Sequence, residues 1–208
     1  MSDALAQACR PRVLPVATVS DVALAAPLAE ALAAGGATAI EVTFRTEAAP
    51  RVVEALADSG LIVGAGTIRS VAQLDEALAA GAQFVVCPAL DDAVVARCLD
   101  AGVPVLPGIA TATELSRALA LGVHTVKVFP AEPLGGAALV AALAAPFPEA
   151  RFVPTGGLGA QNAAEYLRLP PVLAIGGSWM VAPKLLEAED WAAVTRLTAD
   201  AIGLAVAA

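Results

Sequence analysis

Two lysines occur in the 208-residue chain, and one of them lies in an apolar segment. Lys184 follows Pro183 in a predicted exposed loop, whereas Lys127 lies within VKVFP, a predicted strand. A charge in such a strand is costly unless it is paired or neutralised. Removal from water favours the neutral amine, which is the form that attacks a carbonyl carbon. We predict that Lys127 is a covalent nucleophile; the alternative is a solvated lysine on an edge strand.

A second apolar segment carries Glu41, Thr43 and Arg45 at alternating positions. Alternate residues of a strand share one face, so these three side chains are expected to point the same way. Packing alone does not explain a carboxylate and a guanidinium there. Glu41 could transfer the protons that imine formation and carbon–carbon cleavage require, or it could form a buried salt bridge with Lys127.

Glycine-rich turns form the third candidate feature. Thr155-Gly156-Gly157 and Gly176-Gly177-Ser178 each follow a predicted strand, and backbone N–H groups of such turns can bind an anion. Gly64-Ala65-Gly66-Thr67 offers close backbone approach and a hydroxyl, or it is simply a tight turn.

The elements that must position these groups are short aliphatic strands alternating with Ala- and Leu-rich helical stretches. The spacing, about 20 to 27 residues, is that of one βα unit. The strands are expected to begin near Val13, Thr38, Leu61, Gln83, Val103, His124, Arg151 and Val172. Eight such units predict an α/β protein, a single (β/α)₈ TIM barrel over residues 1–208 with an N-terminal helix; an open doubly wound sheet is the alternative.

A barrel would bring the candidate residues together. Active sites of this fold lie at the carboxyl ends of the strands. The second and sixth strands are opposite each other, so Glu41 and Lys127 are expected to meet near the axis. The glycine-rich turns follow the seventh and eighth strands, where barrels commonly bind phosphate.

Composition excludes several function classes. A net charge of −8 disfavours nucleic acid as a partner, and one histidine, His124, excludes a multi-histidine metal site. Three cysteines without metal-type spacing indicate a reducing compartment. Apolar stretches are interrupted before the ~18 to 20 residues that span a bilayer, and the N-terminus lacks the features of a signal peptide. We expect a cytoplasmic protein without nucleic-acid or membrane partners.

With these residues in view, nearly the whole chain resembles the KDPG/KHG aldolases, class I Schiff-base enzymes. These cleave 2-keto-3-deoxy-6-phosphogluconate (KDPG) or 4-hydroxy-2-oxoglutarate (KHG). The matching segments, in family order, are Ile40–Thr46, Val63–Thr67, Lys127–Glu132, Pro154–Gly157 and Ile175–Trp179.

The resemblance implies roles for individual residues. Lys127 would form the Schiff base and Glu41 would be the acid/base. Arg45 and Thr67 would hold the pyruvyl carboxylate, which suits a planar guanidinium. The complete substrate-binding set is expected to be Arg45, Thr67, Pro88, Phe129, Thr155, Gly156, Gly157, Gly176, Gly177 and Ser178.

The implied reaction yields pyruvate and D-glyceraldehyde 3-phosphate from KDPG, or pyruvate and glyoxylate from KHG, with no metal and no cofactor. Family members are trimers, so a homotrimer is expected. Cys87 and Ala89, on either side of Pro88, depart from the familiar Ser and Gly, which bears on substrate preference. The alternatives are the related 6-phosphogalactonate aldolase, a sugar-phosphate isomerase or a non-catalytic phosphosugar-binding barrel.

Overall fold

Strands and helices alternate along the chain in the computed structural model, which describes residues 4–208. The first three residues of the predicted domain lie outside the described part. The strands are β1 (Val13–Ala17), β2 (Ala39–Thr43), β3 (Ile62–Gly66), β4 (Phe84–Val86), β5 (Val105–Leu106), β6 (Gly108–Ile109), β7 (Thr125–Val128), β8 (Arg151–Phe152) and β9 (Ile175–Gly177). The helices are α1 (Ala4–Ala8), α2 (Ala25–Ala34), α3 (Ala49–Ala55), α4 (Val71–Ala79), α5 (Asp92–Asp100), α6 (Ala112–Ala120), α7 (Gly136–Ala144), α8 (Ala163–Leu167), α9 (Pro183–Glu187) and α10 (Trp191–Ala207), with the 3₁₀ turns η1 (Val22–Leu24) and η2 (Trp179–Val181).

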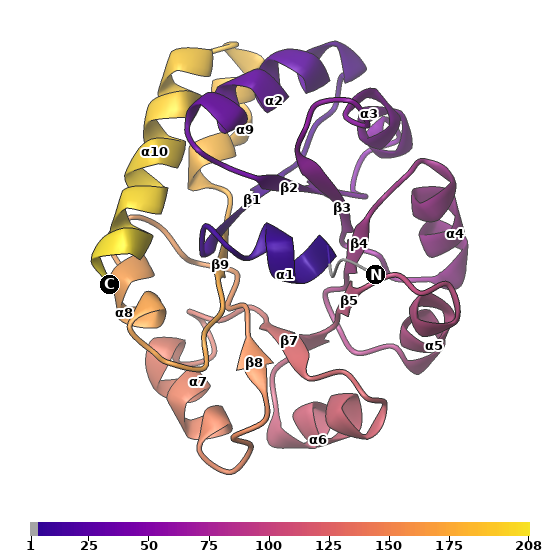
Figure 1. Cartoon of the computed structure of the whole chain (residues 1–208), viewed down its shortest axis with the longest axis vertical. Helices are drawn as coiled ribbons and strands as arrows, with labels where there is room; N and C mark the ends of the chain where they lie inside the picture. Colours follow the sequence, from indigo (N-terminus) through magenta and orange to yellow (C-terminus); the bar gives the residue numbers. More distant parts are fainter. Residues whose placement is uncertain (1–3) are drawn as a thin grey trace.

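All strand pairs are parallel and form a curled sheet with helices outside it (Figure 1). One six-stranded segment has the order β5-β4-β3-β2-β1-β9, and a three-stranded segment has the order β6-β7-β8. Val, Ile and Ala fill the strands, and both faces are buried, as is usual for parallel sheets. This α/β architecture confirms the coarse prediction from the sequence.

The predicted strand near Val103 is divided into β5 and β6. Pro107 lies between them, and proline has no N–H to donate to a neighbouring strand. The carbonyl of Pro107 still accepts a hydrogen bond of 2.8 Å from Lys127 N. The predicted strand near Val172 begins later, at Ile175, and Val172 itself makes an isolated bridge to Phe152.

Side-chain oxygens fix the beginnings of several helices. Asp91, Thr111 and Asp190 each accept a hydrogen bond from the backbone N–H three residues later, at 2.9, 3.3 and 3.0 Å. Such bonds satisfy N–H groups that have no partner within the helix. The prediction of a loop at Lys184 was wrong, because this residue lies on helix α9. Its side chain is exposed, as predicted.

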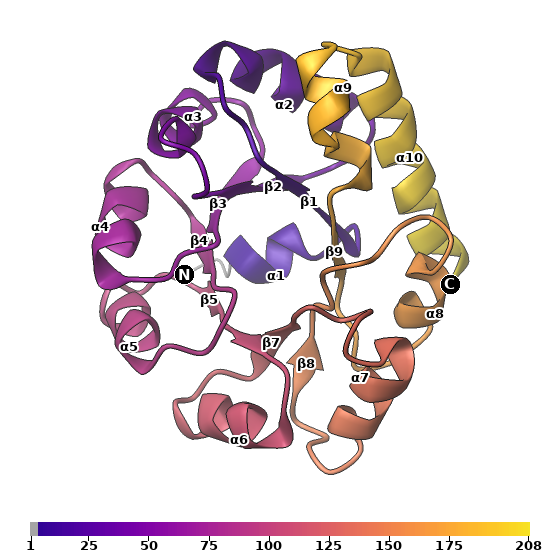
Figure 2. The ribbon, with the colours of Figure 1, turned by 180° about the vertical axis from the view of Figure 1, so that it is seen from behind.

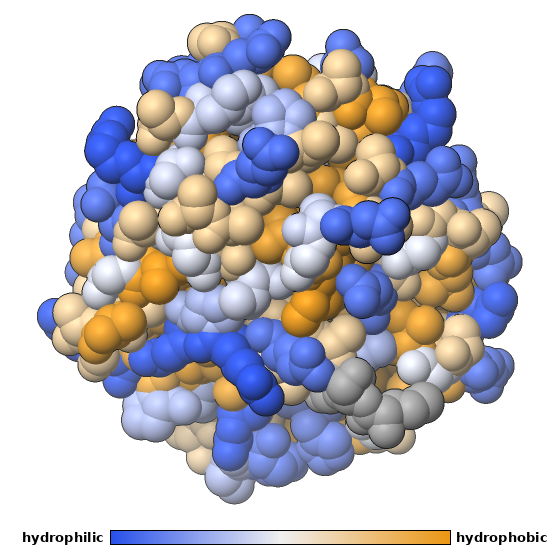
Figure 3. All heavy atoms as spheres, turned by 45° about the horizontal axis from the view of Figure 1, so that its top comes forward, coloured by the Kyte–Doolittle hydropathy of each residue, from blue (hydrophilic) through white to orange (hydrophobic). Residues whose placement is uncertain are grey.

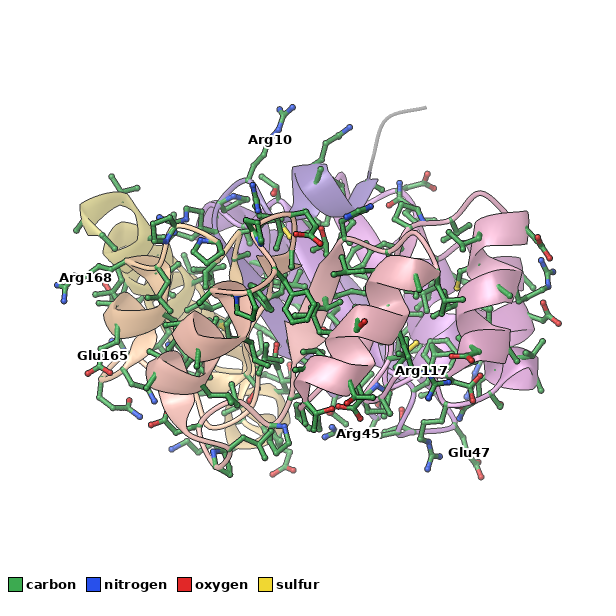
Figure 4. The ribbon with its side chains drawn as sticks, turned by 90° about the horizontal axis from the view of Figure 1, so that it is seen from below. Arg10, Arg45, Glu47, Arg117, Glu165 and Arg168 are labelled. Atoms are coloured by element: carbon green, nitrogen blue, oxygen red, sulfur yellow. The ribbon has the colours of Figure 1, made fainter. Side chains whose placement is uncertain are left out.

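Helix α1 covers the sheet at the amino-terminal ends of its strands. It lies across the middle of the molecule, inside the curl of strands (Figure 1 and Figure 2). Leu5 and Ala8 of α1 join a buried cluster with Leu14, Phe84 and Leu106 from the strands. In the side view, α1 and Arg10 lie at one end of the molecule and Arg45 at the other (Figure 4). A ligand site inside the sheet must therefore open at the carboxyl ends of the strands.

The outer surface mixes polar side chains with small apolar ones on the face seen in Figure 3. The large hydrophobic side chains that are exposed in the described part are Leu99, Leu134 and Val206. The high mean hydropathy of +0.75 thus reflects a filled core and many alanines. No helix among residues 4–208 combines the length and hydrophobicity that a bilayer crossing needs.

Candidate active site

One cavity of about 440 Å³ opens where the strands end. Most of the predicted site residues line it: Glu41, Arg45, Lys127, Phe129, Thr155, Gly156, Gly157, Gly176, Gly177 and Ser178. Thr67 and Pro88 are absent from this lining. The sequence analysis did not place Val16, Thr18, Leu158, Val181 and Pro183 at the site, and these also line the cavity. Val16 and Thr18 alternate at the end of the first predicted strand, but both residue types are common in strands and neither marks a site by itself.

Lys127 on β7 and Glu41 on β2 meet inside this cavity. Lys127 Nζ lies 3.5 Å from Glu41 Oε1, and the two residues are 5% and 1% exposed. Lys127 Nζ also lies 5.2 Å from the centre of the Phe129 ring. The solvated edge-strand alternative for Lys127 is therefore excluded, and the predicted meeting of the two side chains is confirmed.

Gly66 on β3 makes room for the carboxylate of Glu41. A Cβ atom at position 66 would lie 2.2 Å from Glu41 Oε1 and 2.5 Å from Glu41 Cγ. Only glycine allows this approach. The VGAGT segment is thus more than a tight turn, because one of its glycines determines where Glu41 can lie.

The predicted shared face of β2 is confirmed. Glu41, Thr43 and Arg45 all line the cavity; the first two are buried, whereas Arg45 is exposed at its mouth. The hydroxyl of Thr43 lies 2.8 Å from that of Thr18, which follows β1. This end of β2 therefore offers a carboxylate, a hydroxyl and a guanidinium along one line.

The two glycine-rich segments lie side by side at the cavity wall, since Thr155 forms a parallel bridge with Gly176. Thr155-Gly156-Gly157 follows β8 as predicted, whereas Gly176 and Gly177 are part of β9 and only Ser178 follows that strand. A Cβ atom at Gly176 would lie 2.3 Å from Thr155 Oγ1. Gly156 and Gly157 have φ angles of +96° and +80°, a conformation that favours glycine. The two turns present backbone and the Ser178 hydroxyl to the cavity, a surface suited to an anion.

Thr67 and Pro88 lie next to strands of the site. Thr67 follows Gly66 directly and has a φ angle of +60°, which is rare for a β-branched residue. Such backbone strain is concentrated at functional sites. The carbonyl of Pro88 faces Gly108 on β6, where an added Cβ atom would lie 2.3 Å from it.

Cys87, which follows β4, is 1% exposed. Burial raises the pKa of its thiol from 9.0 to about 12, and the neighbouring Cys98 is the second-largest cause of this rise. A thiol that stays protonated at neutral pH is a poor nucleophile, and Cys87 is not among the residues that line the cavity.

The chain is similar to known proteins over most of its length. The family model for KDPG and KHG aldolase matches residues 5–197. The 2-dehydro-3-deoxy-phosphogluconate aldolase of Treponema pallidum is 51% identical over 91% of each chain. The structure of KDPG aldolase from Legionella pneumophila, with pyruvate captured as a covalent carbinolamine intermediate, has a TM-score of 0.91 at 35% identity and covers 96% of this chain and 97% of its own. The 2-keto-3-deoxy-6-phosphogluconate aldolase of Zymomonas mobilis, solved with 3-phosphoglycerate, has a TM-score of 0.90 at 38% identity, with coverage of 95% and 94%. This chain belongs to the KDPG and KHG aldolase family.

Proposed function

We propose that this protein cleaves KDPG to pyruvate and D-glyceraldehyde 3-phosphate through a Schiff base on Lys127. The observation that carries the proposal is the buried pair of Lys127 Nζ and Glu41 Oε1, 3.5 Å apart in a cavity. A buried amine beside a carboxylate that can accept its proton is an arrangement suited to imine chemistry. The carbinolamine held by the Legionella pneumophila enzyme supports the same chemistry here.

Each step uses groups of this cavity. The neutral amine of Lys127 attacks C2 of the keto acid, and loss of water leaves an iminium ion. Glu41, directly or through a water molecule, accepts the proton of the C4 hydroxyl while the C3–C4 bond breaks. The electron pair of that bond moves into the iminium ion and forms an enamine. The aldehyde leaves, C3 gains a proton, and water hydrolyses the imine to release pyruvate and the free lysine.

The pyruvyl carboxylate is assigned to Arg45 and Thr67. Arg45 lies on the same face of the β2 segment as Glu41, at the mouth of the cavity. A guanidinium binds a carboxylate through two parallel hydrogen bonds. The strained backbone at Thr67 supports a binding role for this residue. Phe129, whose ring centre lies 5.2 Å from Lys127 Nζ, forms part of the wall of the proposed pyruvyl pocket; Pro88 is assigned a place behind this wall, since it is not among the residues that line the cavity.

The phosphate is assigned to Gly156, Gly157, Gly176, Gly177 and Ser178, with Thr155 beside them. The phosphorylated ligand of the Zymomonas mobilis structure supports a phosphate site in this chain. This corner of the cavity favours KDPG over KHG. KHG is the second candidate substrate, because the lysine, the carboxylate and the guanidinium suffice for its cleavage to pyruvate and glyoxylate.

Reduction with borohydride in the presence of pyruvate tests the proposal directly. Mass spectrometry is expected to find the reduced pyruvyl adduct on Lys127. Lys184→Arg is the matched control, since Lys184 is exposed on α9, and it should trap pyruvate as the unchanged protein does. Absence of an adduct, or an adduct on Lys184, would overturn the assignment. Cleavage of KDPG and of its C4 epimer, compared side by side, separates the proposed activity from a 6-phosphogalactonate aldolase.

The fold and the assembly carry two further proposals. The curled sheet is a closed (β/α)₈ barrel; support comes from the bridges Phe152–Val172 and Thr155–Gly176 between the β8 and β9 segments, and from the continuity of β5 with β6. The active form is a homotrimer, as the family resemblance implies, in a reducing cytoplasm, as the three cysteines without metal-type spacing indicate. Light scattering tests the trimer, which requires three copies of the 20.7 kDa chain.

A further inference from the structure

Two threonine hydroxyls in the cavity wall have no part in the mechanism above. Thr18, after β1, and Thr43, at the end of β2, place their Oγ1 atoms 2.8 Å apart. Both residues line the cavity, and Thr43 is 1% exposed. A valine would fill the same space in an apolar strand without a buried hydroxyl. The pair therefore calls for a functional explanation.

The hydrogen-bonding capacity of this pair is only partly used. Each hydroxyl has one proton to donate and two lone pairs, and the mutual bond consumes one proton and one lone pair. Among residues 4–208 neither hydroxyl has another partner. Elsewhere threonine hydroxyls donate to backbone carbonyls, as Thr46 does to Val19 at 2.7 Å and Thr195 does to Ala31 at 3.0 Å. One proton of the Thr18–Thr43 pair therefore remains free to donate to a ligand in the cavity.

The position of the pair indicates which part of a ligand it meets. Val16 is in register with Glu41, so Thr18 lies opposite Thr43, one step nearer the mouth than Glu41. On its other side β1 pairs with β9, where Pro15 is in register with Gly177. Continued by one residue, this register puts Ser178 beside Val16, at the level of Glu41. The Thr18–Thr43 pair therefore lines the cavity wall one step nearer the mouth than the line from Glu41 to Ser178.

We infer that the Thr18–Thr43 pair binds the C5 hydroxyl of the substrate, the group between the carbon released by cleavage and the phosphate-bearing carbon. This inference rests on the proposed function. Glu41 serves the C4 hydroxyl and the glycine-rich turns serve the phosphate, so the C5 hydroxyl is the polar group that passes between them. A neutral pair that can both donate and accept matches a hydroxyl, which also does both. The pair determines specificity for the aldehyde half of the substrate and takes no part in bond breaking.

The test compares two aldehydes in the reverse, aldol-forming direction with pyruvate. D-Glyceraldehyde 3-phosphate supplies the hydroxyl that becomes the C5 hydroxyl, and 3-oxopropyl phosphate lacks it. Thr43→Val should lower kcat/KM for the first aldehyde about fivefold to tenfold, the usual effect of one lost neutral hydrogen bond. It should leave kcat/KM for the second aldehyde within about twofold. Thr18→Val should have the same effect, and Thr43→Ser should restore the preference. Thr195→Val is the matched control, because Thr195 does not line the cavity and its hydroxyl donates to Ala31.

Exchange of the methyl protons of pyruvate in D₂O, followed by NMR, separates this role from others. Exchange requires imine formation and proton transfer but no aldehyde, so Thr43→Val should exchange at the rate of the unchanged protein. Equal losses with both aldehydes, or a parallel loss of exchange, would overturn the inference. Failure of the proposed function looks different, because the unchanged protein would then neither exchange pyruvate nor cleave KDPG.

Discussion

The hydroxyl of Tyr166 on α8 donates a hydrogen bond of 2.5 Å to Oε2 of Glu132, in the loop that follows β7. Tyr166 is fully buried, whereas Glu132 is exposed. The backbone N–H of Glu132 donates to the carbonyl of Gly156 at 3.0 Å, and a Cβ atom at Gly157 would lie 2.6 Å from that of Glu132. Glu132 thus connects Tyr166 on α8 to the glycine-rich turn of the proposed phosphate site.

Tyr166→Phe tests this positioning role. The variant keeps the buried ring and removes one hydrogen bond, so the free energy of unfolding should fall by about 1 to 2 kcal/mol in urea titrations. The turn loses its support, so KM for KDPG should rise more than kcat falls, while pyruvate exchange in D₂O stays unchanged. A fall in stability without any change in KM would make the contact purely structural.

Gly66→Ala should disable the site without unfolding the protein. An added Cβ atom would lie 2.2 Å from Glu41 Oε1, so the carboxylate must move away from Lys127. A displaced general base commonly lowers turnover about 10²-fold, and steady-state kinetics measure this. Gly203→Ala on α10 is the matched control, because a Cβ atom there meets nothing within 4 Å, and it should keep full activity.

Glu41→Gln separates imine formation from carbon–carbon cleavage. The amide keeps the shape of the side chain but cannot accept the C4 proton, so kcat for KDPG should fall by about 10² to 10⁴. Borohydride should still trap some pyruvate on Lys127, because the amine remains in the cavity. Turnover close to that of the unchanged protein would remove Glu41 from its proposed role.

The charged residues of the site could be predicted from the sequence because they contradict their surroundings. A lysine or a glutamate in an aliphatic strand is conspicuous, and the order of the strands then places Lys127 and Glu41 face to face. Thr18 could not be found in this way. Threonine is common in strands, so its hydroxyl carries no signal until the register of β1 and β2 places it beside Thr43.

The fold was predictable as alternating strands and helices, and the regularity of its sheet was overestimated. Runs of Val and Ile mark where strands lie, yet backbone pairing depends on individual N–H groups. Pro107 divides one predicted strand, and around Pro154 the pairing of β8 with β9 shrinks to isolated bridges. The packing of Gly66 against Glu41 joins residues 25 positions apart in sequence, so no local pattern reveals it.

Cys87 should make the protein less stable at alkaline pH. Burial and the neighbouring Cys98 raise the pKa of the Cys87 thiol from 9.0 to about 12, so the folded state keeps a proton that the unfolded chain releases. Stability conferred by the neutral thiol is complete below about pH 9 and is lost as pH rises toward the folded pKa. The free energy of unfolding should fall by as much as ~1.4 kcal/mol per pH unit for this group. Cys98, with its pKa raised by burial to about 11, adds a decline of the same sign.

Urea titrations between about pH 8 and pH 11 measure this decline. Cys87→Ala leaves a cavity and so is less stable at every pH, but its decline with pH should be shallower, because one of the ionising groups is gone. Val86→Ala is the matched control, because Val86 is buried at the end of β4, directly before Cys87; the variant leaves a similar cavity and should keep the full slope. If Cys87→Ala and the unchanged protein decline in parallel, the buried thiol ionises as readily in the folded protein as in the unfolded chain.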